Sequence, residues 1–177
     1  MFQRILVPLD GSELAERALP IAARLARASG GSIASLRVVP SPLEFKSLRT
    51  ESSMPMQAVS DSDLAEAVDY LTRIAASSML AVVATTLQVL RGMPAGIIPS
   101  VVRSQQVDII IICSHGYTGM TRRSLGSVAE KVASHIPVAV LVLRNGGAVP
   151  ARPHPDALRP LRALVVLDGS ARAEGGN

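Results

Sequence analysis

VDIIIICSHGYTGMTRRSLGS, residues 107–127, combines a strand pattern, a glycine loop and a helix start in one short stretch. Residues 107–112 are apolar at every position except Asp108, which is the pattern of a parallel strand that is covered on both faces. Glycines and serines then surround two adjacent arginines, and the residues from Ser127 to His135 are expected to form a helix. The stretch therefore predicts one strand, loop and helix unit of an α/β protein.

The same alternation continues on both sides of this stretch. Strands are expected over 4–9, 32–39, near 80–90 and over 137–143, and helices over about 13–28, from residue 61 and over 94–104. Gly30-Gly31 is expected to end the first helix, and the inner face of the second is expected to be Leu64, Val68, Leu71 and Ala75. This order predicts a doubly wound, open parallel sheet of five strands with helices on both faces, a Rossmann-like α/β fold.

Composition narrows the class of protein. A chain of 177 residues with 48% hydrophobic residues has room for one α/β domain with a full core, so global disorder is excluded. Aromatic residues make up only 2%, and the net charge of +4 is spread along the chain, so nucleic acid is not an expected partner. With one cysteine, no leader pattern and no apolar run of about 18 residues, the protein is expected to be cytoplasmic and not to bind membranes.

The C-terminal part of the chain differs from the rest. Residues 145–160 are rich in Gly, Pro, Ala and Arg and are expected to form a linker. Beyond it, RALVVLDGS at 162–170 repeats RILVPLDGS at 4–12, and nine of thirteen residues are identical between 4–16 and 162–174. The expected organisation is a domain over 1–144, the linker, and the truncated start of a second repeat over 161–177.

A candidate site follows from the strand ends. Ligands of doubly wound sheets bind beyond the carboxyl ends of the strands, so the loops after Asp10 and Cys113 are expected to face one pocket. Glycines allow close approach of a ligand, and the helix start at Gly126-Ser127 attracts an anion, which suggests a polyphosphate. Arg122 and Arg123 are candidate donors to it, Asp10 suits ribose hydroxyls, and the backbone of Val38 suits an adenine edge.

Each of these residues also has an explanation that needs no ligand. Ser127-x-x-Glu130 is a capping box, Asp10 and Ser12 are candidate helix caps, and the arginine pair suits a solvated face. Cys113 and His115 would share a strand face, but no third acidic group accompanies them, so thiol catalysis is not expected. The sequence contains no P-loop and no spaced set of metal ligands.

The loop pattern resembles that of a known family. Ser114-His-Gly116, nine residues and Gly126-Ser127 resemble the nucleotide loop of the universal stress protein family, G-x2-G-x9-G-[S/T], whose first glycine is Cys113 here. Residues 5–12, 127–132 and 137–143 look like the other hallmarks of the family, so that the resemblance covers about residues 2–144. The repeated start resembles the members that carry two such domains in tandem.

The resemblance implies an adenine nucleotide hydrolase-like fold that binds ATP, with Mg, as a regulatory module in the stress response. It also implies a homodimer through the strand Val138–Leu143. Alternatives are a stress or scaffold protein that binds no nucleotide and acts by dimerisation, and a slow ATPase. The expected nucleotide-binding residues are Pro8, Asp10, Ser12, Val38, Cys113, His115, Gly116, Gly119, Arg122, Gly126, Ser127 and Val128.

Overall fold

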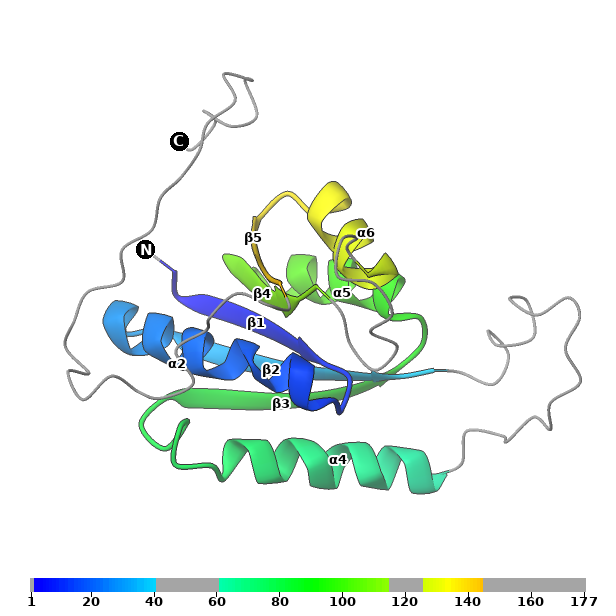
Figure 1. The fold of residues 1–177 in the computed structure, drawn as a ribbon, viewed down its shortest axis with the longest axis horizontal. Coiled ribbons are helices and arrows are strands. Elements are labelled where there is room, and N and C mark those ends of the chain that lie inside the picture. Colours follow the sequence, from blue (N-terminus) through cyan, green and yellow to red (C-terminus); the bar gives the residue numbers. More distant parts are fainter. Residues whose placement is uncertain (1, 41–60, 115–125, 145–177) are drawn as a thin grey trace, which may run out of the picture.

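The computed structural model describes residues 2–40, 61–114 and 126–144 of the chain, and its centre is a parallel sheet (Figure 1). The strands are β1 (Arg4–Leu9), β2 (Ser32–Val39), β3 (Ala84–Arg91), β4 (Ile109–Cys113) and β5 (Ala139–Leu143). They lie in the order β3-β2-β1-β4-β5, and every pair is parallel. The chain winds outward from β1 in one direction and then from β4 in the other, which confirms the doubly wound fold.

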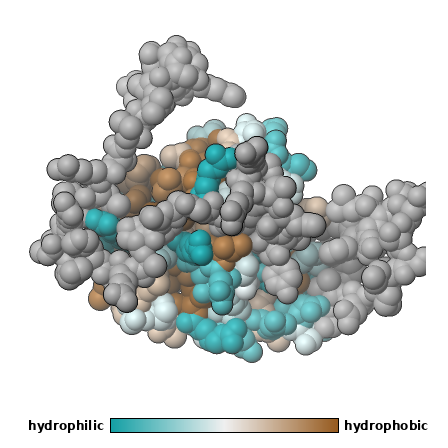
Figure 2. Space-filling model, viewed as in Figure 1, coloured by the Kyte–Doolittle hydropathy of each residue, from teal (hydrophilic) through white to brown (hydrophobic). Residues whose placement is uncertain are grey.

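Five helices of the described residues cover the two faces of this sheet. They are α1 (Glu13–Glu16), α2 (Ala18–Ser29), α4 (Asp61–Ala75), α5 (Pro94–Gln105) and α6 (Ser127–His135). One buried cluster joins α1, α2 and α4 to the sheet, and a second joins α5 and α6 to its other face. Figure 2 shows hydrophilic residues gathered along the outer side of α4, at the bottom of the view.

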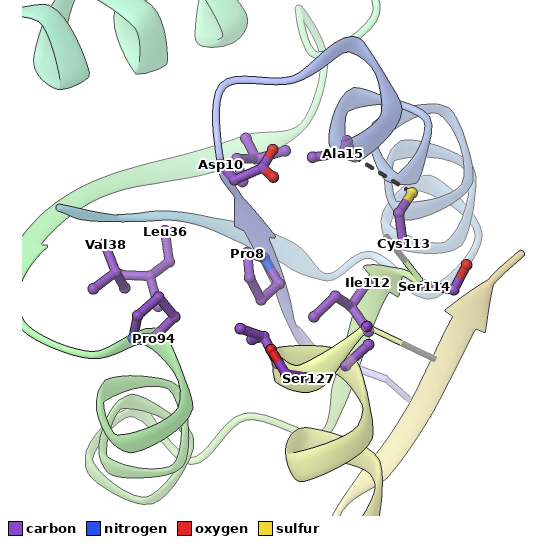
Figure 3. Close-up of a pocket in the computed structure, with 14 residues that line it drawn as sticks. Pro8, Asp10, Ala15, Leu36, Val38, Pro94, Ile112, Cys113, Ser114 and Ser127 are labelled. Atoms are coloured by element: carbon purple, nitrogen blue, oxygen red, sulfur yellow. Dashed lines mark hydrogen bonds between the residues drawn. The ribbon is translucent and has the colours of Figure 1, made fainter. Parts of the chain in front are cut away.

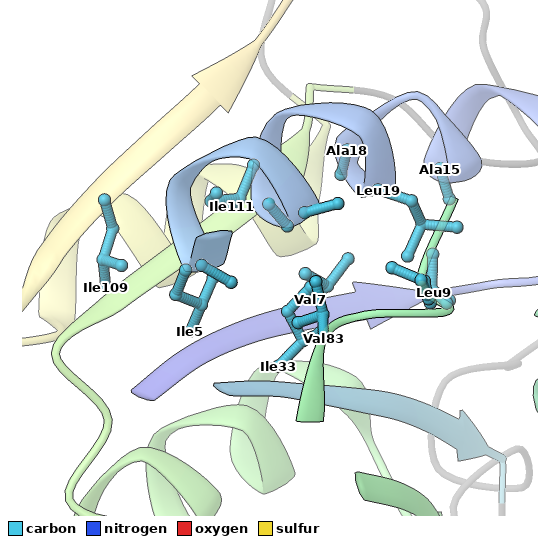
Figure 4. Packing of buried hydrophobic residues seen from close by; sticks show 14 of the residues in the cluster. Ile5, Val7, Leu9, Ala15, Ala18, Leu19, Ile33, Val83, Ile109 and Ile111 are labelled. Atoms are coloured by element: carbon cyan, nitrogen blue, oxygen red, sulfur yellow. The ribbon is translucent and has the colours of Figure 1, made fainter. Parts of the chain in front are cut away.

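Strict alternation along the strands divides the core between these two faces. In β1, Ile5, Val7 and Leu9 belong to the cluster beneath α2, whereas Leu6 belongs to the cluster beneath α5 and α6 (Figure 4). All five residues of β4 are buried, as expected for a strand with helices on both sides. The apolar run at residues 109–112 therefore lies inside the sheet, beside β1.

The expected first helix is interrupted. It divides into α1 and α2 at Arg17, whose backbone N–H donates to the Leu14 carbonyl at 3.3 Å. Pro20 explains the break, because it has no N–H to donate to the Glu16 carbonyl and is tolerated only in the first turn of α2. At the other end, Gly30 has a φ of 64° and ends α2 as predicted.

The inner face of α4 was predicted only in part. Leu71 is fully buried, but Val68 is 51% exposed, and Ala67 is buried in its place. Tyr70 and Ile74 also pack against the cluster beneath this helix. The stripe that contacts the sheet is therefore displaced by one residue from the predicted one, although the helix begins at Asp61 as predicted.

Three strand boundaries also differ from expectation. β3 begins at Ala84 because Leu80 and Val83 reach the core from successive turns before it. β4 begins at Ile109, because Asp108 closes the sheet end by accepting backbone N–H groups of Gln3 and Arg4 at 2.7 and 2.8 Å. β5 begins at Ala139, two residues later than predicted. The expected loop over 41–60, the linker and the second repeat lie outside the described residues.

In residues 2–40, 61–114 and 126–144, no helix is both long and apolar enough to cross a membrane.

Candidate functional site

A cavity of about 250 Å³ opens at the carboxyl edge of the sheet, where β1 and β4 lead to opposite sides (Figure 3). This is the position at which doubly wound sheets bind ligands. Its walls come from the ends of β1, β2 and β4 and from the starts of α5 and α6. The lining residues are Pro8, Leu9, Asp10, Ala15, Leu36, Val38, Pro94, Ile112, Cys113, Ser114, Gly126, Ser127, Val128 and Ala129.

One part of the cavity is apolar. Leu36 and Val38 project from the same face of β2, and Pro94 closes this side as the first residue of α5. Pro8 and Ile112 form the floor between β1 and β4 (Figure 3). Such a slot at the ends of strands, with backbone groups at its rim, suits a flat and largely apolar ring.

The turn after β1 is held by its own hydrogen bonds. One carboxylate oxygen of Asp10 accepts the Ser12 backbone N–H at 3.0 Å and the Ser12 hydroxyl at 2.6 Å. The Ser12 oxygen in turn accepts the Ala15 N–H at 3.2 Å, which makes Ser12 the N-cap of α1. Gly11 between them has a φ of 88°, a conformation that favours glycine. The turn therefore fixes the Asp10 carboxylate at the cavity wall.

The start of α6 is built differently. Gly126, not Ser127, is the N-cap, and no side chain in the described part of the chain caps this helix. The predicted capping box is therefore wrong. Ser127 is already the first helical residue, so its hydroxyl is not placed, as that of an N-cap would be, to accept the backbone N–H of Glu130. Ser127, Val128 and Ala129 all line the cavity. The first N–H groups of a helix have no acceptor within it, so α6 presents its positive end there.

The strand end and the helix start are tied together at the base of the glycine loop. The Ser114 carbonyl accepts the Gly126 N–H at 2.7 Å, and the Ser114 N–H donates to the Leu143 carbonyl at 2.7 Å. Ser114 is only 2% exposed. His115, Gly116, Gly119, Arg122 and Arg123 belong to residues 115–125, which lie outside the described residues.

The side chain of Cys113 lies on the face of the sheet that α2 covers. Its thiol donates to the Ala15 carbonyl at a sulfur to oxygen distance of 3.8 Å, and it packs in the cluster beneath α2 (Figure 3). Burial raises the pKa of this thiol to about 11, so that it stays protonated at neutral pH. A protonated, buried thiol is a poor nucleophile, which argues against thiol catalysis. Cys113 thus lines the cavity with a thiol that is already bonded to the Ala15 carbonyl.

The structure brings most of the described candidate residues to one place. Seven of them line the cavity, namely Pro8, Asp10, Val38, Cys113, Gly126, Ser127 and Val128. Ser12 does not line it, but its hydroxyl donates a hydrogen bond to Asp10, which does. The predicted set lacks seven of the lining residues, which are Leu9, Ala15, Leu36, Pro94, Ile112, Ser114 and Ala129. Two of these carried a usable signal, since Leu36 alternates with Val38 on one strand face and Pro94 begins a helix that follows a strand.

Titratable groups at the cavity are few. Within the described residues, no group of three or more His, Cys, Asp and Glu side chains could hold a metal ion. Asp10 is the one carboxylate in the described lining. The described walls therefore offer a ligand backbone N–H groups, one carboxylate and an apolar slot.

Comparisons with known proteins agree on the kind of protein. The sequence profile of the Universal stress protein family matches residues 1–144. Universal stress protein MJ0531 of Methanocaldococcus jannaschii is 28% identical over 146 residues, which are 82% of this chain and 84% of that protein. The chain is also similar to the structure of universal stress protein UspA from Lactobacillus plantarum, with 23% identity and a TM-score of 0.64 over 81% of this chain and 98% of the other.

A further solved structure of the same fold contains a nucleotide. It is the universal stress protein from Archaeoglobus fulgidus in complex with dAMP, which is 22% identical with a TM-score of 0.58 and covers 81% of this chain and 98% of that one. The match of the family profile extends from β1 to the end of β5 and includes every described element of the sheet. The chain therefore belongs to the universal stress protein family.

Proposed function

We propose that the chain is a cytoplasmic, ATP-binding regulatory module of the stress response. The observation that carries this proposal is that the start of α6, which no described side chain caps, and the Asp10 carboxylate lie on the walls of one cavity. A positive helix end suits phosphates, and a fixed carboxylate suits ribose hydroxyls. The complex of a relative of this fold with dAMP supports an adenine nucleotide as the class of ligand.

The parts of the nucleotide have separate places in this proposal. The adenine ring enters the apolar slot of Leu36, Val38 and Pro94 and bonds the backbone at the end of β2. The ribose hydroxyls donate to Asp10. The phosphates accept the N–H groups of Ser127 and Val128 at the start of α6, since the Gly126 N–H is bonded to the Ser114 carbonyl. They also bind the loop residues that the sequence pattern assigns, which are His115, Gly116, Gly119 and Arg122, and Gly126 allows their close approach.

Magnesium would enter with the nucleotide. Mg²⁺ in proteins keeps several waters and is bound through one or two carboxylates and the phosphates of the substrate. Asp10 is the one carboxylate in the described lining and is assigned to the ribose, so Mg²⁺ would be held mainly by the phosphates and by water rather than by a cage of protein ligands. The ion would neutralise phosphate charge, while Asp10 and the α6 N–H groups orient the nucleotide.

Turnover of the nucleotide is expected to be slow. Asp10 already accepts two hydrogen bonds from Ser12, and Cys113 is buried and protonated, so neither is a good general base for water. Occupancy of the cavity, rather than product formation, would then carry the signal.

The output of this module is proposed to be a homodimer. β5 lies at one end of the sheet and pairs with β4 on one side only among the described residues. Its Leu141 is 36% exposed, which is a large exposure for leucine in a strand. Residues Val138–Leu143 would pair with the same strand of a second copy, and such pairing covers an edge that would otherwise invite aggregation. The start of α6 and β5 share the Ser114 contact network, so ligand and dimer are adjacent.

Released nucleotide tests the proposal directly. Freshly purified protein is denatured, and the released nucleotide is identified by chromatography, with Gly126→Val beside wild type. Gly96→Val is the matched control, since Gly96 lies in α5 with open space around it and does not line the cavity. ATP or ADP near one per chain from wild type and Gly96→Val, and none from folded Gly126→Val, is expected.

The alternative functions give different results. Wild type that releases no nucleotide and does not bind added Mg-ATP would contradict the proposal and would favour a scaffold that acts by dimerisation alone. Steady release of ADP from bound ATP, abolished in a folded Asp10→Ala variant, would instead identify a slow ATPase.

A further inference from the structure

Arg37 lies behind the turn that carries Asp10. It is in β2, opposite Leu9 of β1 and Val89 of β3. Strand alternation places its side chain on the same face as Ile33, beneath α2 and α4, whereas Leu36 and Val38 face the cavity side. Arg37 therefore does not line the cavity, and nothing in the family pattern considered above assigns it a role.

The guanidinium of Arg37 covers Gly11. A Cβ atom built on Gly11 would lie 2.9 Å from Nη1, 3.1 Å from Nη2 and 3.2 Å from Cζ of this arginine. Three atoms of one planar group at nearly equal distances show that the guanidinium meets the turn with a broad surface. Since Gly11 has no side chain, the guanidinium packs directly against the backbone of the turn.

The guanidinium of Arg37 also contacts an aromatic ring. Cζ of Arg37 lies 5.8 Å from the centre of the Tyr70 ring, within the range of a cation–π contact. Tyr70 packs against the core beneath α4, and its pKa is raised by burial and by the Glu16 carboxylate, while Arg37 acts in the opposite direction. The Nε atom of Arg37 is buried and has no hydrogen-bond partner among the described residues. Stacking therefore contributes to holding this side chain between α4 and the turn.

We propose that Arg37 is a positioning residue for the nucleotide site, clamped between Tyr70 and Gly11 so that the Asp10–Gly11–Ser12 turn keeps its shape. This inference rests on the proposed function for its effect on nucleotide affinity. Movement of Gly11 would disturb both hydrogen bonds from Ser12 to Asp10, and with them the orientation of the carboxylate at the cavity. Arg37 thus acts on the ligand through the turn and without touching it.

Arg37→Met tests the clamp, because methionine keeps an apolar stem but has no charge and no planar group. Arg91→Met is the matched control, since Arg91 ends the neighbouring strand and pairs with Asp61 at the surface, away from the cavity lining. Two quantities are measured in each variant: hydrogen exchange of the Ser12 amide relative to amides of β4, and the dissociation constant for Mg-ATP well below the melting temperature. The first needs no nucleotide.

For Arg37→Met we expect exchange at Ser12 and the dissociation constant each to rise about tenfold, with β4 amides and Arg91→Met close to wild type. Arg37→Lys, which keeps the charge but not the planar group, should give an intermediate result and serves if the methionine variant fails to fold. Exchange at Ser12 that is unchanged in a folded Arg37 variant would overturn the clamp. Faster exchange at Ser12 in a protein that binds no Mg-ATP even as wild type would keep the clamp and reject the nucleotide function.

Discussion

Two helix starts meet the same cavity, and the chain treats them in opposite ways. At α1, the Ser12 hydroxyl oxygen accepts the Ala15 N–H as the N-cap. The backbone N–H and the hydroxyl of Ser12 both donate to the Asp10 carboxylate, so the polar groups of Ser12 have partners within this turn. At α6, Gly126 is the N-cap, and no side chain of the described residues caps this helix, so that its first N–H groups have no side-chain acceptor there. The comparison indicates that the α1 side is a rigid support and that the α6 side is where an anion would bind.

The two sides also differ in what would damage them. The α1 side depends on one glycine with positive φ, on a cap and on the arginine behind it. The α6 side has a glycine N-cap at φ −63° and ψ 152°, which other residues can adopt. Changes on the α1 side should therefore lower stability, whereas changes on the α6 side should affect ligand binding first.

The largest expected effect on stability is that of Gly11→Ala. A side chain at a φ of 88° is strained, and the new Cβ would lie 2.9 Å from Nη1 of Arg37, so the free energy of unfolding should fall by about 2 kcal/mol. Urea denaturation measures this loss. Gly96→Ala is the control, because Gly96 lies inside α5 with open space and alanine should raise stability there. If the free energy of unfolding of Gly11→Ala were as high as that of Gly96→Ala, the description of the turn would be contradicted.

A pair of serine variants compares the two helix starts directly. Ser12→Ala removes the N-cap of α1 and one donor to Asp10, and should lower the free energy of unfolding by about 1 kcal/mol. Ser127→Ala removes no cap, because Ser127 is the first helical residue of α6, and should change stability by less than about 0.5 kcal/mol. Thermal unfolding of both proteins at one pH separates them, and equal losses would show that Ser127 also acts as a cap.

A smaller effect is expected at high pH, from Cys113. Its pKa is raised by burial to about 11 in the folded protein, so stability is complete below the thiol pKa of the unfolded chain and is lost as pH rises toward the folded value. At pH 9 the loss should be under about 1 kcal/mol. Cys113→Ala should remove this part of the pH dependence in denaturation experiments between pH 7 and 10. A wild-type thiol that alkylates at pH 8 as fast in the folded as in the unfolded chain would contradict the burial.

Most of the fold could be predicted from the sequence because the patterns that indicate its strands, turns and helix ends are local and strong. The continuous isoleucine run, the Asp-Gly-Ser turn and the glycine pair at 30–31 each have one common structural meaning. The predicted helix face and strand start were wrong where the local sequence allows two structures equally well and tertiary contacts select one of them. Tyr70 and Ile74 pack against the core in place of Val68, and Leu80 and Val83 reach it from turns although their sequence suits a strand.

The candidate site was predictable from the rule that strand ends converge, and less so in its details. The rule located Asp10, Val38 and Ser127, but the sequence could not show that Gly126 would replace Ser127 as the N-cap, because both residues are good caps. Nor could it show Arg37 against Gly11, a contact that depends on the register of β1 with β2. Pairings between strands are nonlocal and leave little trace in a single sequence.

Amide chemical shifts during a titration test the central contrast most directly. Mg-ATP, adenosine and inorganic triphosphate are added separately to labelled protein, and the amides of Ser127, Val128, Val38 and Ser12 are followed by NMR. The account predicts that triphosphate shifts Ser127 and Val128, that adenosine shifts Val38 and the Asp10 turn, and that Mg-ATP shifts both sets. If Mg-ATP left the Ser127 and Val128 amides unmoved, the start of α6 would be no phosphate site, and the proposed function would fail.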